Sequence, residues 1–504
     1  MIDSSMLPVL LIVGPILAAA IPLVLGLRLT DVGWSVALTV TGLTFVGAAW
    51  MAYDVYTGGG PIVHELGGFQ PPIGIELVTD RFSAAIALLV ASVSFAILSY
   101  TRVGGPRGNT FYAGYLLLVG GLMGVTFTGD VFNLFVFLEI TGIATYALVA
   151  RGRGGGAAFA ALKYLILGTL GASLYLVGVG FLFLGTGTLN MNDLGMRLAA
   201  MGYDDPLVRA SFAFIVVGFA IKVAQWPVHT WQPDAYQRAP DGITPMIAAL
   251  VSTVSAYALG RVLYTVYTPE FLRMTPYASE LLVTIGSASI VAGSVLAVIQ
   301  WDVKRMLAYS SVSHFGMIVA AYGLVTETAL LGAMVHLIGH GLMKVGLFVG
   351  VAIVAVTLGV RTVEQYGGLA RDRPYTAGAI AVLGLALVGI PPSIGFIGKW
   401  YIAIGSVEAA LWPVAALIFL STMLTLAYVA RLGERMYFQS DTGPSHRVDA
   451  RPFLTDGGSY MGRRPSLGMR TLLIVVAIVA VALGFAGAGL DAAFAPYVEE
   501  VFAT

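Results

Sequence analysis

The sequence contains no cysteine and very little charge. None of its 504 residues is a cysteine, which excludes disulfide bonds, thiolate metal sites and cysteine nucleophiles. Charged residues make up only 11% of the chain and hydrophobic residues 58%, whereas soluble domains carry about 25% charged residues. So few polar residues cannot cover a soluble fold of this size. The composition therefore excludes a cytosolic enzyme, a nucleic-acid-binding protein and a disordered chain, and leaves a helical membrane protein.

Lysine is the next scarce residue. The 27 basic residues balance 27 acidic ones, so net charge points to no particular partner. Only five of the basic residues are lysines, and the other 22 are arginines. The lysines are Lys163, Lys222, Lys304, Lys344 and Lys399. A buried lysine can release its proton whereas arginine effectively never does, so the position of each lysine is informative.

Long apolar runs fill most of the chain. A membrane-spanning helix needs about 20 mainly apolar residues. Breaking the chain at polar, glycine-rich and proline-rich clusters gives fourteen such segments. They lie at 6–26, 32–56, 81–101, 110–128, 130–150, 157–185, 207–228, 241–268, 279–300, 305–325, 327–358, 375–404, 407–430 and 469–490. The sequence therefore predicts an all-α polytopic membrane protein with fourteen transmembrane helices.

The loops predict an orientation. Eighteen basic residues lie in loops after odd-numbered helices and four in loops after even-numbered ones. Because basic loops stay in the cytoplasm, this bias predicts both termini outside a multi-pass inner (plasma) membrane protein. Glycine and proline clusters in the loop 57–80 predict a small hairpin. The arginine-rich loop 431–468 either covers one membrane face or is a flexible linker.

Several charged residues fall within the predicted spans. The intramembrane cations are Lys163, Lys222, Arg261, Lys344 and Lys399, whereas Lys304 is assigned to a loop. Each costs roughly 2.5–3.5 kcal/mol at a helix centre on insertion scales. Such residues usually face a bundle interior or a hydrated cavity and mark ion or proton pathways. We therefore expect the intramembrane lysines to face the interior, together with Glu139 and three histidines.

Glu139 lies near mid-membrane in the predicted span 130–150. It is about nine residues inside the helix, roughly 13 Å along the axis. A carboxyl group at this depth is either a proton-relay group or a protonated acid that hydrogen-bonds between helices, and the available lysines favour the relay. A buried lysine holds its proton beside a carboxylate and releases it more readily without one. Breaking a Glu139–Lys222 pair would therefore release or recruit a proton.

Lys222 and Lys399 each lie beside a predicted helix break. Pro227 follows Lys222, and the sequence 390–392 (Ile-Pro-Pro) precedes Lys399. Proline breaks or kinks a helix, and broken helices at membrane depth are tolerated where they line a cavity. This pattern resembles the discontinuous helices of transporters built from inverted repeats. The alternative is two lysines that snorkel to the membrane surface.

The lysine spacing predicts an internal repeat. Lys163 precedes Lys222 by 59 residues and Lys344 precedes Lys399 by 55, and five helices separate the two pairs. A repeat with an odd number of helices must invert its topology. We therefore expect two inverted five-helix repeats, helices 4–8 and 9–13, each with one broken helix. The predicted divisions are N-terminal helices and hairpin loop (1–109), first repeat (110–268), second repeat (279–430), and cytoplasmic loop with the last helix (431–504).

Three titratable residues form a stripe on the predicted helix 327–358. His336, His340 and Lys344 are spaced four residues apart and so share one face. Imidazole accepts and donates protons near neutral pH, so the stripe is typical of a proton relay, with His314 as a further member. A metal site is one alternative, but the stripe carries no carboxylate and has a cation one turn away. Ordinary core histidines are the other alternative.

Several motifs match one known family in order along the chain. They lie at 129–139, 222–235, 302–311, 336–344 and 389–400. Over roughly 60–430 the sequence resembles the proton-translocating antiporter-like subunits. This family includes the Mrp-type multisubunit Na+/H+ antiporters and the antiporter-like subunits of respiratory complex I and membrane-bound hydrogenases. The length, without a long lateral C-terminal helix, makes the chain most similar to the D subunit of the Mrp antiporter.

The resemblance implies roles for the candidate residues. Glu139 and Lys222 would be the coupling pair of helices 5 and 7, and Lys399 the terminal lysine of the second half-channel. The stripe on 327–358 would belong to a central hydrophilic axis. The candidate proton path therefore contains Glu139, Lys163, Lys222, His314, His336, His340, Lys344 and Lys399. In one departure, Thr253 stands where many relatives carry a lysine or histidine in helix 8, and threonine cannot take a charge.

The implied function is a proton-translocating subunit of a multisubunit Na+/H+ antiporter. Its partners would be other membrane subunits, protons, a monovalent cation such as Na+, and the lipid bilayer. The alternative is a proton-pumping subunit of a complex I-type NADH:quinone oxidoreductase or a membrane-bound hydrogenase. A structural subunit with a vestigial channel is disfavoured by the presence of Glu139, Lys222 and Lys399. Without cysteine ligands or a flavin motif, we expect no cofactor, no metal and no catalytic residue.

Overall fold

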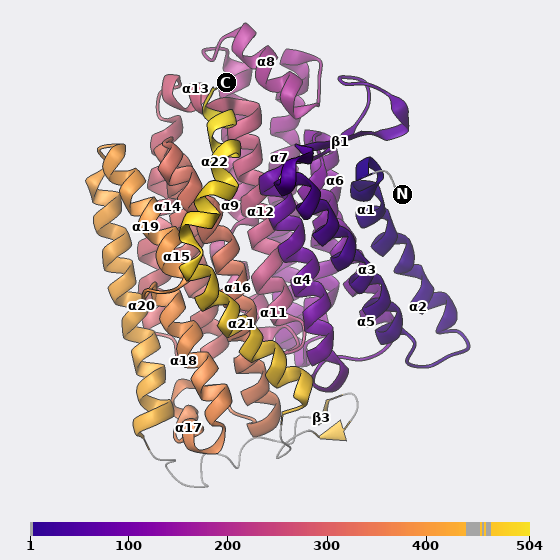
Figure 1. Cartoon of the computed structure of the whole chain (residues 1–504), viewed down its shortest axis with the longest axis vertical. Coiled ribbons are helices and arrows are strands. Elements are labelled where there is room, and N and C mark those ends of the chain that lie inside the picture. Colours follow the sequence, from indigo (N-terminus) through magenta and orange to yellow (C-terminus); the bar gives the residue numbers. More distant parts are fainter. Residues whose placement is uncertain (1–3, 440–453, 456–457, 460–464, 504) are drawn as a thin grey trace.

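The molecule is a bundle of long helices with very little sheet. The computed structural model describes residues 4–439, 454–455, 458–459 and 465–503. Most helices run between the upper and lower ends of the view in Figure 1 and pack around a continuous buried core. Their outward faces carry exposed leucine, isoleucine, valine and phenylalanine side chains. An apolar surface around an apolar core is suited to a lipid bilayer.

The first half of the chain, coloured indigo to magenta in Figure 1, contains a small hairpin among its helices. The helices are α1 (Leu7–Ala18), α2 (Ala20–Leu25), α3 (Gly33–Asp54), α4 (Arg81–Gly104), α5 (Asn109–Phe127), α6 (Val131–Ala150), α7 (Gly154–Thr186), α8 (Met191–Met201), α9 (Pro206–Lys222), α10 (Trp231–Arg238), α11 (Thr244–Met246), α12 (Ser252–Arg261) and α13 (Thr268–Met274). Strands β1 (Ile62–Glu65) and β2 (Glu76–Thr79) pair antiparallel, with Ile62 opposite Thr79. The predicted hairpin in the loop 57–80 is confirmed.

The second half, coloured orange to yellow, completes the bundle. Its elements are α14 (Ala278–Val298), α15 (Val303–Leu324), α16 (Glu327–Leu358), α17 (Leu369–Asp372), α18 (Pro374–Val388), α19 (Ile394–Glu408), α20 (Trp412–Phe438), β3 (Leu454–Thr455), β4 (Gly458–Ser459), α21 (Leu467–Phe485) and α22 (Gly487–Ala503). In Figure 1, α21 and α22 cross the front of the bundle to the C-terminus at the upper end. Both helices contact α4 of the first half and α16 of the second, so they join the two halves.

Within the described residues, twelve helices are long and apolar enough to cross a membrane. The predicted segments 207–228 and 375–404 are not among them, because a break divides each into two shorter helices. The predicted count of fourteen is therefore not confirmed. The nearly all-helical, multi-pass architecture is confirmed.

The two broken helices have the same design. One break separates α9 from α10 and contains Pro227, and the other separates α18 from α19 and contains Pro391 and Pro392. Each break also contains a residue with positive φ, which is 56° at Ala224 and 90° at Gly389. A right-handed helix cannot continue through a left-handed residue or donate from a proline nitrogen. Both helices therefore break where the sequence predicts.

The arginine-rich loop predicted at 431–468 begins as helix. Residues 431–438 continue α20, and 467–468 start α21. The short strands β3 and β4 within this stretch pair with each other. The rest of the prediction concerns residues 440–453, 456–457 and 460–464, which lie outside the described part of the chain.

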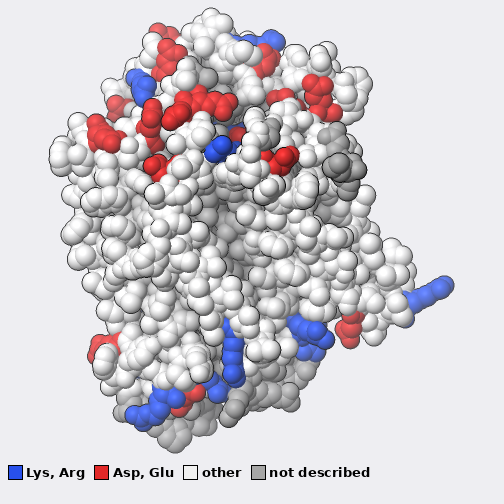
Figure 2. Space-filling view, viewed as in Figure 1, with Lys and Arg blue, Asp and Glu red and all other residues white. Residues whose placement is uncertain are grey.

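Charge distinguishes the two ends of the bundle. Figure 2 shows acidic side chains gathered mainly at the upper end, basic side chains at the lower end, and a wide uncharged belt between them. Helices α8 and α13 lie at the upper end and α17 at the lower end (Figure 1). The belt is the region that a bilayer would surround.

Candidate functional site

Lys222 and Glu139 form an ion pair inside the bundle. Lys222 Nζ donates to Glu139 Oε1 at 3.0 Å, and the side chains are only 8% and 22% exposed. Lys222 is the last residue of α9, and Glu139 lies in the middle of α6. The structure thus brings together the two residues that the sequence analysis pairs.

The start of α6 sets the depth of Glu139. The Asp130 carboxylate accepts a hydrogen bond from the Asn133 backbone N–H at 2.6 Å and so caps the first turn. Glu139 follows the first helical residue by eight positions, about 12 Å along the axis. It is the only carboxylate in α6. An otherwise apolar helix therefore carries one acid at mid-depth.

The break after Lys222 is closed by hydrogen bonds to the end of α9. Trp231 Nε1 donates to the Ile221 carbonyl oxygen at 2.8 Å, and the Gln225 N–H donates to the Ala220 carbonyl oxygen at 2.8 Å. These bonds satisfy carbonyls that the break would leave without partners. The Lys222 ammonium lies at the negative end of the α9 dipole, which stabilises a cation there.

Lys399 hydrogen-bonds to the backbone at the break in its own helix. It lies in α19 and its Nζ donates to the Leu387 and Val388 carbonyl oxygens, at 3.1 and 2.9 Å, across the break in the last turn of α18. Its side chain is 6% exposed. Because Lys222 and Lys399 both point to partners within the protein, the snorkelling alternative is wrong for both.

A glycine lets the Lys399 helix approach the histidine helix. A Cβ atom built on Gly398 would lie 2.6 Å from both Cα and Cβ of His336. Contacts this close are possible only for residues without a side chain, which is why small residues line tight helix interfaces in membranes. Gly398 thereby places Lys399 of α19 beside the histidine stripe of α16.

The three predicted histidines form one cluster between α15 and α16. His314 Nδ1 lies 2.9 Å from His336 Nε2, and the His314 and His340 ring centres are 5.7 Å apart. All three side chains are fully buried. Within the described residues, both ring nitrogens of His340 and one each of His314 and His336 have no hydrogen-bonding partner. No group of three or more His, Asp or Glu residues in the same part of the chain is arranged to hold a metal ion.

Lys344 lies two helical turns from His336 on α16 and is fully buried. Its Nζ donates to the Leu307 carbonyl oxygen at 2.7 Å and to the Ser310 hydroxyl. Leu307 and Ser310 lie on α15, the helix that also carries His314. Two lysines and three histidines are therefore gathered in the second half.

Lys163 pairs with Asp234, which is not among the candidate residues predicted from the sequence. Its Nζ binds Asp234 Oδ2 at 2.8 Å, and Arg305 binds Asp234 Oδ1 at 2.9 Å. Asp234 lies on α10, so its carboxylate connects α7 of the first half to α15 of the second. The sequence signal was available, because Asp234 lies within the 222–235 motif.

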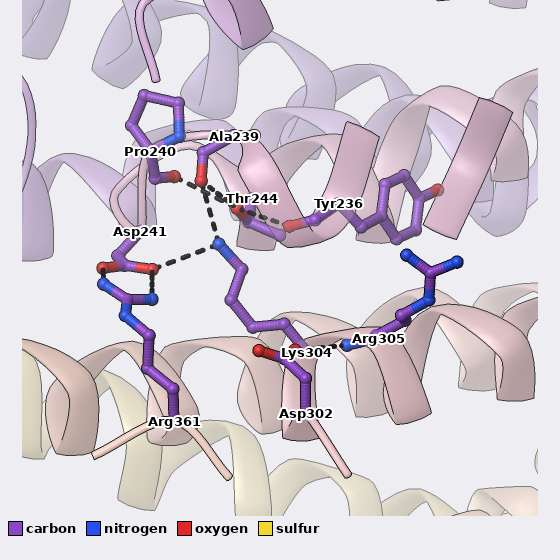
Figure 3. A network of polar contacts seen from close by, with 9 residues as sticks. All are labelled: Tyr236, Ala239, Pro240, Asp241, Thr244, Asp302, Lys304, Arg305 and Arg361. Atoms are coloured by element: carbon purple, nitrogen blue, oxygen red, sulfur yellow. Dashed lines mark hydrogen bonds and ion pairs between the residues drawn. The ribbon is translucent and has the colours of Figure 1, made fainter. Parts of the chain in front are cut away.

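A second acid, Asp241, joins the halves near the lower end of the bundle. Figure 3 shows its carboxylate between Lys304 and Arg361. Lys304 Nζ binds Asp241 Oδ1 at 3.1 Å, and Arg361 donates to both carboxylate oxygens at 3.1 and 2.7 Å. Burial alone would raise the pKa of the Asp241 carboxyl group, but the charges of Lys304 and Arg361 outweigh burial and hold the pKa well below its usual range.

The assignment of Lys304 to a loop is wrong. It is the second residue of α15 and only 4% exposed, and its Nζ also donates to the Ala239 carbonyl oxygen at 2.9 Å (Figure 3). Residues 300–305 are mostly polar, so their hydropathy alone predicts a loop. The buried position depends instead on Asp241, which lies in the turn between α10 and α11.

Thr253 lies in α12 directly after a π-helical stretch, Ile247–Val251. Its side chain is fully buried and its hydroxyl has no hydrogen-bonding partner among the described residues. Both polar side-chain atoms of Gln225 and His229 Nδ1 are also buried without a hydrogen-bonding partner among the described residues. Gln225 and His229 lie in the break after Lys222. Buried polar atoms in native proteins nearly always have a partner, which is often water. These buried polar groups are therefore candidate positions for water.

Residues 128–425 match the family model described as "NADH:quinone oxidoreductase/Mrp antiporter, TM". The match covers more than half of the chain and contains every candidate residue. This chain belongs to that family.

Among curated proteins, the chain is 38% identical to the N subunit of the NADH-quinone oxidoreductase of Desulforudis audaxviator over 95% of this chain and 96% of that one. It is 29% identical to the D subunit of the Na(+)/H(+) antiporter of Bacillus subtilis over 82% and 84% of the two chains. The family resemblance seen in the sequence is confirmed. The chain is an antiporter-like membrane subunit of the kind found in Mrp or complex I-type complexes.

Two solved structures have the same fold. A chain of an archaeal membrane-bound sulfane sulfur reductase superposes with a TM-score of 0.88 at 30% identity, covering 98% of this chain and 97% of that one. A chain of the Mrp complex of Dietzia sp. DQ12-45-1b gives a TM-score of 0.86 at 24% identity, with 100% of both chains covered. Both chains come from complexes, an archaeal respiratory membrane complex and the Mrp complex.

Proposed function

We propose that this chain is the proton-translocating subunit of a multisubunit cation/proton antiporter, with Na+ as the exchanged cation. One observation carries the proposal: the buried Lys222–Glu139 ion pair at the break between α9 and α10. A lysine held by one carboxylate beside a broken helix can exchange its proton when the pair opens. Apolar helices surround the pair, so it differs from the solvent-exposed ion pairs of a protein surface. Charged groups at such positions usually mark ion or proton pathways.

The proposed path continues from Lys222 into the second half of the bundle. Thr253 and His229 would hold water between the first pair and α16. Lys344 and the three clustered histidines would then carry the proton to Lys399, which lies at the second break. Lys163 would act on the path through Asp234, whose carboxylate it shares with Arg305.

The proposed architecture is two inverted repeats, 110–268 and 279–430, flanked by 1–109 and 431–504. In support, α7 and α16 are long helices of 33 and 32 residues, each followed by a broken helix with a lysine. Two isolated β-bridges also correspond: Asp130, just before α6, pairs with Asn190, and Asp302, just before α15, pairs with Thr362. The segments after α7 and α16 lie at opposite ends in Figure 1, as inversion requires.

The proposed orientation places the basic lower end in the cytoplasm and both termini outside, in an inner (plasma) membrane. The basis is the predominance of basic residues at that end (Figure 2). The C-terminus lies at the opposite, acidic end in Figure 1.

A second candidate function is a proton-pumping subunit of a redox-driven complex. The observation that favours it is the 38% identity to the N subunit of an NADH-quinone oxidoreductase, higher than the 29% identity to the D subunit of an antiporter. In that case electron transfer would occur on other chains and this chain would keep the same proton path. Mass spectrometry of the intact purified complex distinguishes the two, through small antiporter subunits or redox subunits beside this chain.

The test of proton translocation uses the purified complex in liposomes that contain a pH-sensitive dye. We expect Glu139→Gln and Lys222→Ala to abolish coupled proton flux. Asp193→Asn is the matched control, because it breaks the 3.0 Å pair with Arg197 on the more exposed helix α8. Undiminished flux in both pair variants would contradict the proposal.

A further inference from the structure

An arginine-lined cavity opens at the lower, basic end of the bundle. Its volume is about 270 Å³, and it lies where the loops 104–106 and 151–153 meet the end of α10 and the residues around the start of α15. Four arginines line it: Arg151, Arg153, Arg238 and Arg361. Two aspartates, Asp241 and Asp302, are the acidic residues among the lining side chains. Nothing in the proton path uses this cavity.

The two aspartates are already engaged. Asp241 is shared by Lys304 and Arg361, as Figure 3 shows, so one carboxylate meets two cations. The Asp302 carboxylate accepts the Arg305 backbone N–H at 2.9 Å and caps α15. Among the described residues, neither carboxylate forms an ion pair with Arg151 or Arg238, so the positive charge of these two arginines remains in the cavity.

Arg151 and Arg238 retain hydrogen-bond donors for a ligand. Arg151 donates to the Thr110 hydroxyl at 2.7 Å and to the Arg107 carbonyl oxygen at 3.4 Å, both of which are neutral acceptors. Among the described residues, no ion pair includes Arg151 or Arg238. A planar guanidinium presents several donors in a fork that matches phosphate oxygens.

The backbone beside these arginines adds to the positive potential. Helix α7 begins at Gly154 directly after Arg153, without a side-chain cap. The Arg238 guanidinium lies next to its third residue, because a Cβ atom on Gly156 would be 3.2 Å from Arg238 Nη1. A 33-residue helix starting beside the cavity directs the positive end of its dipole toward it. The helix start supplements the side-chain charges here.

We propose that this cavity binds a phosphate group, carried by the headgroup of an anionic membrane lipid. The chemistry is phosphate recognition by Arg151 and Arg238, with Arg361 held in place by Asp241. The position favours a lipid as the source, since the cavity lies at the end of the membrane spans, where headgroups lie. Free phosphate offers the same chemistry from the cytoplasm.

The experiment uses the intact complex, stripped of lipid by detergent exchange and examined by native mass spectrometry after incubation with phosphatidylglycerol or phosphatidylcholine. The test variant is Arg151→Gln/Arg238→Gln. The control variant is Arg28→Gln/Arg371→Gln, which removes two exposed arginines from the predicted cytoplasmic loops. We expect wild type and control to retain one more phosphatidylglycerol than the test variant, and all three to retain phosphatidylcholine equally.

A parallel arm replaces lipid by inorganic phosphate and measures the thermal unfolding of the complex. Stabilisation by inorganic phosphate, lost in the test variant, with no difference in lipid retention, would assign the site to free phosphate and overturn the lipid source. Equal retention and equal unfolding in all variants would overturn the site itself. If the double variant does not assemble, Arg238→Gln alone is measured against Arg28→Gln alone with the same criteria.

Discussion

Lys222 Nζ lies 3.0 Å from Glu139 Oε1. Lys222 is the last residue of α9, the first half of a broken helix, and Glu139 lies in the middle of α6. Removing one partner of a buried pair leaves an uncompensated charge, which costs about 3–5 kcal/mol. A variant that loses transport after such a change has therefore lost either a proton carrier or a stable site. Measuring stability and proton flux on the same variant separates these two effects.

Lys222→Arg keeps the positive charge and the pairing with Glu139, but arginine does not release its proton. We expect the complex to assemble and to unfold at nearly the wild-type temperature, because the ion pair persists. Proton flux in liposomes should fall by about a hundredfold, a typical loss for a proton-transfer group. Wild-type flux in this variant would show that the pair only supports the fold.

Gly398→Ala should separate the Lys399 helix from the histidine helix. The added methyl group would lie 2.6 Å from His336 backbone and side-chain atoms, so α19 must shift away from α16. We expect destabilisation of about 1–3 kcal/mol, typical of overpacking, and loss of proton flux. Thermal unfolding of the complex and dye-based flux measure the two effects.

Gly180→Ala is the matched control for Gly398→Ala. Gly180 lies in α7, and no atom lies within 4 Å of a Cβ built there. Alanine at such a helical site should leave stability unchanged or raise it by about 0.4–1 kcal/mol. Equal effects of the two substitutions would contradict the role assigned to the close contact.

Asp241→Asn should destabilise the complex by about 3–5 kcal/mol, because it leaves Lys304 buried without a counter-charge. The folded-state pKa of Asp241 is lowered, so its stabilising effect is present above the unfolded value of about 3.9 and lost as pH falls through the folded pKa. The stability difference between wild type and variant should therefore be constant from about pH 5 to 8 and shrink in stronger acid. Thermal unfolding of both proteins, measured from pH 8 down into this stronger acid, tests it. A difference that disappears between pH 6 and 8 would be incompatible with this account.

Asp234→Asn should disturb the connection between the halves. It removes the carboxylate that Lys163 and Arg305 share at 2.8 and 2.9 Å. The three side chains are partly exposed, so we expect a loss of stability below about 1 kcal/mol but a clear reduction of proton flux. Unfolding temperature and flux are measured together, and Asp193→Asn again serves as control. Normal flux would restrict Asp234 to a structural role.

Thr253→Val tests the step at which the sequence departs from many relatives. Valine has nearly the same shape, and the Thr253 hydroxyl has no hydrogen-bonding partner among the described residues, so the fold should be unaffected. If this hydroxyl holds water on the path, flux should fall severalfold in Thr253→Val and remain normal in Thr253→Ser. Equal flux in all three proteins would place the path elsewhere.

The sequence by itself determined the class of the protein and the positions of its breaks. Runs of about 20 apolar residues and the shortage of charge are local properties, and a bilayer permits only a few responses to them. Pro227 and the pair Pro391–Pro392 remove backbone donors wherever the helix is placed, so both breaks could be predicted. The hairpin at 57–80 followed from its own turn residues.

Only the tertiary structure decided what the lysines bind. Lys163 pairs with Asp234, 71 residues away, and Lys304 with Asp241, 63 residues away. Lys399 binds carbonyl groups that exist as acceptors only because α18 ends there. No local pattern specifies such partners, because helix packing selects which of many distant groups share one desolvated space. The sequence therefore identified the titratable residues, while the packing of α9, α15, α16 and α19 determined which of them are neighbours.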